Sequence, residues 1–96
     1  MVHQLINNRG NYAANQFVID TNNATYFQSY RSVVCKLQNG KVIVSNNWDY
    51  SRTTSKHLYI FLAQNGYSHL CSAKDMRKAI KEGEVTLVNV SSINID

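Results

Sequence analysis

Four cations lie at helical spacing in the C-terminal third of the chain. Lys74, Arg77, Lys78 and Lys81 are separated by three or four residues, the spacing that places side chains on one face of a helix. A positive stripe of this kind can follow a phosphate backbone or an acidic groove on a protein. The alternative is structural, because a surface helix needs a solvated face and its dipole favours cations near the C-terminus. The stripe is a candidate macromolecule-binding site, and both interpretations stay open.

Aromatic and cationic residues also gather in a region with strand character. Tyr26, Tyr30 and Arg31, with Lys41, would present rings and charge on one sheet face, as proteins that bind single-stranded nucleic acid do. Tyr is equally a favoured strand residue and is common at protein interfaces. No RNP-like aromatic motif is present, so nucleic-acid stacking and a general surface role are both open for these residues.

A third cluster, WDYSRTTS at residues 48 to 55, combines aromatic, acidic, basic and hydroxyl side chains. Such a mixture can form a polar recognition site at the exit of a sheet. The favoured interpretation is a structural corner in which the indole is buried and Asp49 accepts backbone N–H bonds near a helix start. Thr53 or Thr54 would cap that helix. Arg52 has no such local role, and we single it out as the functional residue of the cluster.

Residues typical of catalysis or metal binding are not arranged for either task. His3, His57 and His69 show no metal-ligand spacing with Cys35 or Cys71, and no pair of carboxylates is placed for acid–base work. The glycines form neither a dinucleotide-binding nor a phosphate-binding loop. Cys71 precedes a predicted helix, whose dipole would stabilise a thiolate, but most such thiols are structural. We therefore predict a non-enzymatic protein without catalytic residues, cofactor or metal.

Composition predicts one soluble domain over residues 1–96. The chain has 44% apolar and 17% charged residues, which is too apolar for disorder, and it contains no linker-like stretch. Its net charge of +4 fits a nucleic-acid binder, a binder of acidic protein surfaces, or a domain that is merely basic. The longest apolar stretch, residues 58–63, is too short to span a bilayer, and the N-terminus lacks a signal peptide. We expect an intracellular protein with no membrane partner.

The elements that position these residues are predicted as an α+β fold, a small antiparallel sheet with two helices packed on one face. The order is β-β-β-α-α-β. Residues 1–12 form a loose lead-in, and residues 14 to 20 form the first strand. A hairpin follows, in which residues 26–37 and 41–45 are joined by Asn39-Gly40, because both positions of such a turn need positive φ.

Two helices and a last strand complete the predicted fold. Residues 56 to 65 carry an apolar stripe and end at Gly66. The second helix starts at Ser72, which has Asp75 three residues later as in a capping box, and ends at Gly83. Residues 84 to 90 alternate as a strand that pairs at or near a sheet edge.

Two segments resemble a domain of unknown function found in phage and prophage proteins. The first is YFQSYRSVVCKLQNGKVIVSNNWDYSRTTSKHLYIFL, residues 26 to 62, and the second is SAKDMRKAIKEGEVTLVNV, residues 72 to 90. The most specific piece is WDYSRTTSKH, residues 48 to 57, joined to the upstream FQSY. The resemblance implies a phage or mobile-element origin and no established catalytic residue. Small phage proteins often inhibit host defence, as anti-CRISPR proteins do, so by analogy it suggests an anti-defence protein.

These observations lead to three functional hypotheses. The first is a phage-type binding protein of the host-cell cytoplasm that inhibits or redirects a host macromolecular machine by steric binding. Its partner would be a host protein or ribonucleoprotein, such as a CRISPR nuclease complex. The second is a direct DNA- or RNA-binding module, whose affinity would fall steeply with salt. The third is a phage structural or assembly protein that self-associates through an exposed edge strand. The sequence leaves the oligomeric state open.

Overall fold

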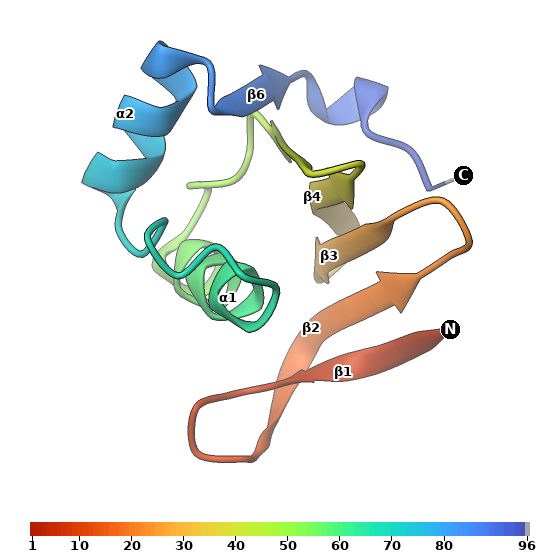
Figure 1. Cartoon of the computed structure of the whole chain (residues 1–96). Coiled ribbons are helices and arrows are strands. Elements are labelled where there is room, and N and C mark those ends of the chain that lie inside the picture. The colour runs from red at the N-terminus through yellow and green to blue at the C-terminus, as the bar shows by residue number, and fades with distance from the viewer. Residues whose placement is uncertain (96) are drawn as a thin grey trace.

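The computed structural model describes residues 1–95, which form one sheet and two α-helices (Figure 1). The strands are β1 (Val2–Ile6), β2 (Tyr12–Asp20), β3 (Thr25–Ser29), β4 (Ser32–Gln38), β5 (Lys41–Ser45) and β6 (Val85–Val88). The helices are α1 (Arg52–Gln64) and α2 (Ala73–Glu82), and a 3-10 turn, η1 (Val90–Ser92), follows β6. The α+β class is as predicted.

The sheet is mixed. Its spatial order follows the chain from β1 to β6, and all neighbours are antiparallel except β6, which is parallel to β5. The chain leaves β5, passes through both helices and returns as β6, and helical crossovers of this kind connect parallel strands. The predicted order β-β-β-α-α-β is therefore corrected to β-β-β-β-β-α-α-β. The prediction that the last strand lies at an edge is confirmed.

The predicted loose lead-in at residues 1–12 is wrong, because half of it belongs to the sheet. Val2 pairs with Ile19 and His3 with Val18. Leu5 is the one fully buried side chain of β1. Because β1 buries only one apolar residue, its sequence shows no clear alternation of apolar and polar residues by which a strand could be predicted. Backbone hydrogen bonds with β2 hold it in the sheet.

The stretch predicted as one strand, residues 26–37, is two strands joined by a tight turn. Ser29 and Ser32 are paired across that turn, whose tip is Tyr30 and Arg31. Tyr30 has a φ of 57°, a left-handed conformation that is rare for a large side chain. The tip of the turn contains no Gly, Pro, Asn or Asp, so it lacks the strongest of the residue types by which turns are predicted. By contrast, the hairpin at Asn39-Gly40 is confirmed, with φ values of 52° and 74°.

The helix boundaries follow from their caps. The Ser51 hydroxyl accepts a hydrogen bond from the Thr54 amide at 3.1 Å, so the predicted cap at Thr53 or Thr54 is wrong by two or three residues. In α2, Ser72 caps the amide of Asp75 at 3.1 Å, and Gly83 ends the helix with a φ of 84°, both as predicted. No helix within residues 1–95 has the length and apolar content needed to cross a bilayer.

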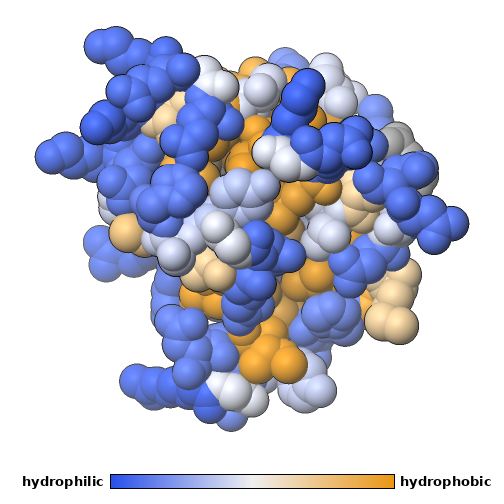
Figure 2. Space-filling model, in the orientation of Figure 1, coloured by the Kyte–Doolittle hydropathy of each residue, from blue (hydrophilic) through white to orange (hydrophobic). Residues whose placement is uncertain are grey.

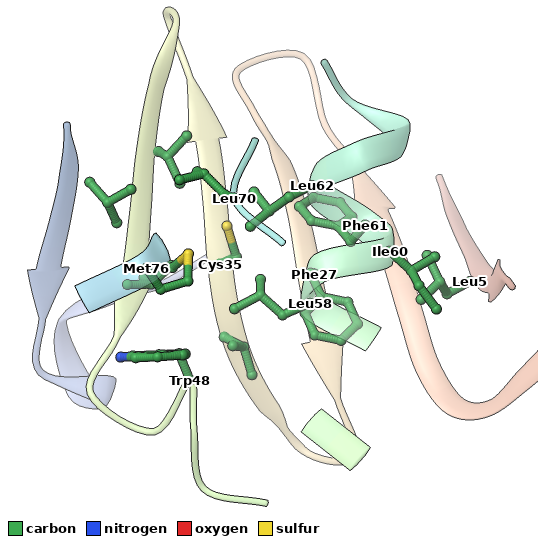
Figure 3. Packing of buried hydrophobic residues seen from close by; sticks show 14 of the residues in the cluster. Leu5, Phe27, Cys35, Trp48, Leu58, Ile60, Phe61, Leu62, Leu70 and Met76 are labelled. Atoms are coloured by element: carbon green, nitrogen blue, oxygen red, sulfur yellow. The ribbon is translucent and has the colours of Figure 1, made fainter. Parts of the chain in front are cut away.

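Both helices pack on the same face of the sheet (Figure 1). Phe61 of α1 stacks on Phe27 of β3, with ring centroids 5.5 Å apart, and Leu58 and Leu62 lie beside this pair (Figure 3). Met76 carries α2 into the same cluster next to Cys35. The helical layer is thus fixed through buried side chains, which leaves its outer side in solvent.

The opposite face of the sheet carries a smaller cluster. Tyr26, Ile19 and Ala24 are buried there, with Val33 packed against them. After β6 the chain runs over the side of the sheet away from the helices (Figure 1), η1 lies against β4, and Ile93 is buried. The two faces are therefore covered differently, one by helices and one by the C-terminal segment.

Candidate functional site

The predicted basic stripe lies on the solvent side of α2. Lys74, Lys78 and Lys81 are exposed, and none of them forms an ion pair with a carboxylate of residues 1–95. Figure 2 shows hydrophilic side chains projecting from the region of α2 at the upper left. These three ammonium groups are available to a partner.

The fourth member of the stripe, Arg77, is held by intramolecular contacts. Its guanidinium lies 3.6 Å from a carboxylate oxygen of Asp49 and 5.9 Å from the ring centroid of Trp48. Both contacts are partly exposed, so each contributes at most about 1 kcal/mol. They direct Arg77 toward the connection between β5 and α1, away from the other three cations.

The cluster at residues 48 to 55 is a structural corner in most respects. Trp48 is buried, and Thr54 is buried with its hydroxyl 3.0 Å from that of Ser29. Asp49 pairs with Arg77, where a bond to the backbone of α1 was expected. Arg52 is exposed and forms no ion pair within the described chain, so it remains free to contact a partner.

A groove that the sequence did not reveal runs between α1 and the turn that joins β1 to β2. It consists of two adjoining hollows of about 410 Å³ each, which share Asn8, Lys56 and Ile60. Arg52 lines one hollow and Arg9 the other. Arg9 and Lys56 were missed because neither lies in a cationic cluster of the sequence. The tertiary structure brings them to one groove.

The predicted set of surface tyrosines divides. Tyr26 is fully buried on the face away from the helices, with the Lys36 ammonium 5.6 Å from its ring centroid. The expectation that it presents a ring for stacking is wrong, because the C-terminal segment covers this side of the sheet. Tyr30 and Arg31 are exposed at the β3–β4 turn, where a partner can reach both.

A pocket of about 430 Å³ joins this turn to the corner before α1. Its lining comes from both segments: Ser29, Tyr30, Ser32, Val34, Asn47, Tyr50 and Thr54. The FQSY and WDYSRTTSKH segments, far apart in the chain, therefore meet at one place. Tyr50, which is 83% exposed, was not singled out from the sequence, although it lies in the cluster that was.

Next to the pocket lies a buried polar group without a partner. Gln16 pairs with Ser29 across β2 and β3 and is fully buried, and neither its amide nitrogen nor its carbonyl oxygen has a hydrogen-bond partner within the described chain. An unsatisfied buried amide destabilises the folded state. Gln16 could not be recognised from the sequence, because β2 exposes most of its other polar residues.

The two thiols are both held in the protonated form. Burial raises the pKa of Cys35 far above its ordinary value. Cys71 is exposed, and its thiol donates a hydrogen bond to the Asp75 carboxylate at 3.3 Å, which raises the pKa of Cys71. The bond from Ser72, followed by that from Cys71, lowers the pKa of Asp75. The dipole of α2 would favour the thiolate form of Cys71, but the neighbouring Asp75 carboxylate disfavours it. No three His, Cys, Asp or Glu side chains of residues 1–95 are grouped as metal ligands.

Comparison with known proteins adds a family and no activity. A model of a family of unknown function, DUF8033, matches residues 1–81, which include the sheet up to β5, α1 and most of α2. No curated protein and no solved structure matches the chain.

Proposed function

Because the chain belongs to DUF8033, a family of unknown function, we propose its function from its own surface. It is a non-enzymatic binding protein that uses the outer side of its helical layer to occupy an acidic surface of a larger partner. That partner is a protein or ribonucleoprotein of the host-cell cytoplasm, and the protein inhibits or redirects it by steric binding, as phage anti-defence proteins do.

The observation that carries this proposal is a set of exposed cations that form no ion pair with another described residue. Arg52 and Lys56 lie on α1, and Lys74, Lys78 and Lys81 lie on α2. Two acidic groups near these cations are already engaged, since Asp49 pairs with Arg77 and Glu84 with His69. Unpaired cations on one side attract an acidic surface and accelerate association with it.

Rigidity of the same surface supports steric binding. Both helices are capped, and both are anchored through buried residues of one cluster. The cations therefore stand on elements that lose little conformational freedom when a partner docks, which favours affinity. Binding through lysine and arginine side chains also costs conformational entropy, because these long side chains become ordered in the interface. We therefore expect neutral contacts to contribute to the interface as well.

The test is affinity capture from a bacterial lysate with the full chain, in nuclease-treated and untreated halves. A variant with Lys74→Glu, Lys78→Glu and Lys81→Glu is compared with the parent and with Lys41→Glu, an exposed cation of the β4–β5 hairpin. We expect the parent and Lys41→Glu to retain one and the same protein in both halves, and the triple variant to lose it.

Circular dichroism shows whether the triple variant is folded, since Lys81 also lies in the last turn of α2, where the helix dipole favours a cation. Retention of the partner by a folded triple variant would contradict the proposal for α2. Loss of every retained species after nuclease treatment would replace the protein partner with nucleic acid.

A further inference from the structure

We infer that the pocket between the β3–β4 turn and the corner before α1 binds an unstacked base of a single-stranded nucleic acid. This site is separate from the lysines of α2, and the inference stands whether or not those lysines contact a partner. It assigns a role to Tyr30 of the FQSY segment and Tyr50 of the WDYSRTTSKH segment, two residues that the proposed function does not use.

The lining of the pocket selects a neutral, hydrogen-bonding group. None of the described residues that line it is ionisable near neutral pH by type: the polar ones are Ser29, Ser32, Asn47, Thr54 and the two tyrosines, Tyr30 and Tyr50. Hydroxyl and amide groups both donate and accept hydrogen bonds, as the edges of nucleobases do. A phosphate or carboxylate would find no counter-charge here. The volume of about 430 Å³ accommodates a base together with its sugar.

Two tyrosine rings flank this polar lining. Tyr30 is 52% exposed and Tyr50 is 83% exposed, although large aromatic rings gain free energy by leaving water. A nucleobase stacked on one or both rings would cover them, which is how sequence-tolerant single-strand binders hold bases. Exposed rings beside a hydrogen-bonding pocket therefore fit a flat heterocycle better than an aliphatic group.

Tyr30 is held in its position before any ligand arrives. Its amide donates to the Asn15 carbonyl at 2.7 Å, and its own carbonyl accepts from the Gln28 side chain at 2.8 Å. These bonds maintain the left-handed backbone at this residue, a conformation that concentrates at functional sites. Because the backbone of Tyr30 is fixed in this way, stacking on its ring requires ordering of the side chain only.

Two cations lie close in the sequence to the tyrosines of the pocket and do not line it themselves. Arg31 directly follows Tyr30, and Arg52 lies two residues after Tyr50. Both are exposed, and neither forms an ion pair within residues 1–95. Arg52 also lines the groove that leads to Lys56. A strand with one base in the pocket would thus meet guanidinium groups with its flanking phosphates. A neutral carbohydrate would have no use for them.

The test measures fluorescence anisotropy of labelled 12-mers with the full chain at about 50 mM salt, where phosphate contacts are strong. The ligands are single-stranded RNA, single-stranded DNA, a duplex, and a strand in which abasic spacers replace the bases. We expect binding of at least one single strand, with weaker binding of the duplex and of the abasic strand. The RNA and DNA arms decide which sugar the site prefers.

The variants are Tyr50→Ala and Tyr30→Ala, with Tyr12→Ala as the matched control, because Tyr12 on β2 is 68% exposed and does not line the pocket. Loss of a stacking ring should weaken single-strand binding roughly fivefold to 150-fold, and Tyr12→Ala should leave it unchanged. Tyr50 is so exposed that its removal should not disturb the fold.

Three outcomes would overturn the inference: no binding of either single strand, equal binding of the abasic strand, or tyrosine variants that bind like Tyr12→Ala. Equal binding of the abasic strand would show that the cations alone hold nucleic acid. In that case the charge-based proposal for the helical surface would survive, so the two failures are distinguishable.

Discussion

Replacement of Gln16 by Met should stabilise this protein, although most substitutions of fully buried residues destabilise. The Gln16 side chain is fully buried, and both of its polar atoms lack a partner within the described chain. Removal of an unsatisfied buried polar group recovers about 1–3 kcal/mol. Met is similar to Gln in length and volume, so imperfect packing of the new side chain should lower stability by at most about 1.5 kcal/mol. The expected net gain is about 1 kcal/mol.

The gain is measurable in two ways. Urea unfolding can be followed by the fluorescence of Trp48, the single tryptophan, which is buried. Thermal unfolding can be followed by circular dichroism, and a gain of about 1 kcal/mol raises Tm by roughly 4–8 °C in a domain of this size. If the urea transition is also followed by circular dichroism, coincidence of the two urea curves tests two-state unfolding.

Gln28→Met is the matched control, because the same change there removes a bond that exists. The Gln28 amide donates to the carbonyl of Tyr30 at 2.8 Å, and loss of such a bond costs about 0.5–1.5 kcal/mol. The two variants should therefore shift stability in opposite directions. If Gln16→Met lowers stability by more than about 1 kcal/mol, the amide of Gln16 is hydrogen-bonded in solution and the reasoning is refuted.

Two further predictions concern the ends of α2. Gly83→Ala should lower the free energy of unfolding by about 1–2 kcal/mol. The cause is the φ of 84° alone, because an added Cβ meets no atom within 4 Å. Gly83→Asn should lower the free energy of unfolding by less in the same urea titration, and equal losses would contradict a conformational origin. Asp75→Asn should shift the pH profile of Cys71 alkylation to lower pH, because the Asp75 carboxylate raises the pKa of that thiol. An unchanged profile in mass-spectrometric rate measurements would contradict this cause, and the buried Cys35 serves as the unreactive control.

The candidate site was predictable only in part. Lys74, Lys78 and Lys81 are exposed as expected, because helical spacing alone decides which residues share a face. Arg77 has the same spacing but is held by Asp49 and Trp48, a contact between segments that no local pattern contains. Tyr30 and residues 48 to 55 were predicted as separate sites, because nothing in the order of residues indicates that the two segments line one pocket.

The sequence by itself determined the features that depend on neighbouring residues. The Asn39-Gly40 turn, the Ser72 cap and the Gly83 stop follow from backbone preferences of single residues, and the structure has them where they were predicted. Local chemistry was sufficient there, because every atom that decides the conformation lies within a few positions in the chain.

Only the tertiary structure decided the features that depend on partners far away in the chain. β1 forms a strand because β2 pairs with it. β6 is parallel to β5 because the chain passes through two helices between these strands. Tyr26 is buried on the face of the sheet that the C-terminal segment covers. Burial and strand pairing depend on how the sheet, the helices and the C-terminal segment pack together. A segment with alternating apolar and polar residues can therefore be predicted as a strand, but its sequence does not show which face of the sheet is covered by other elements.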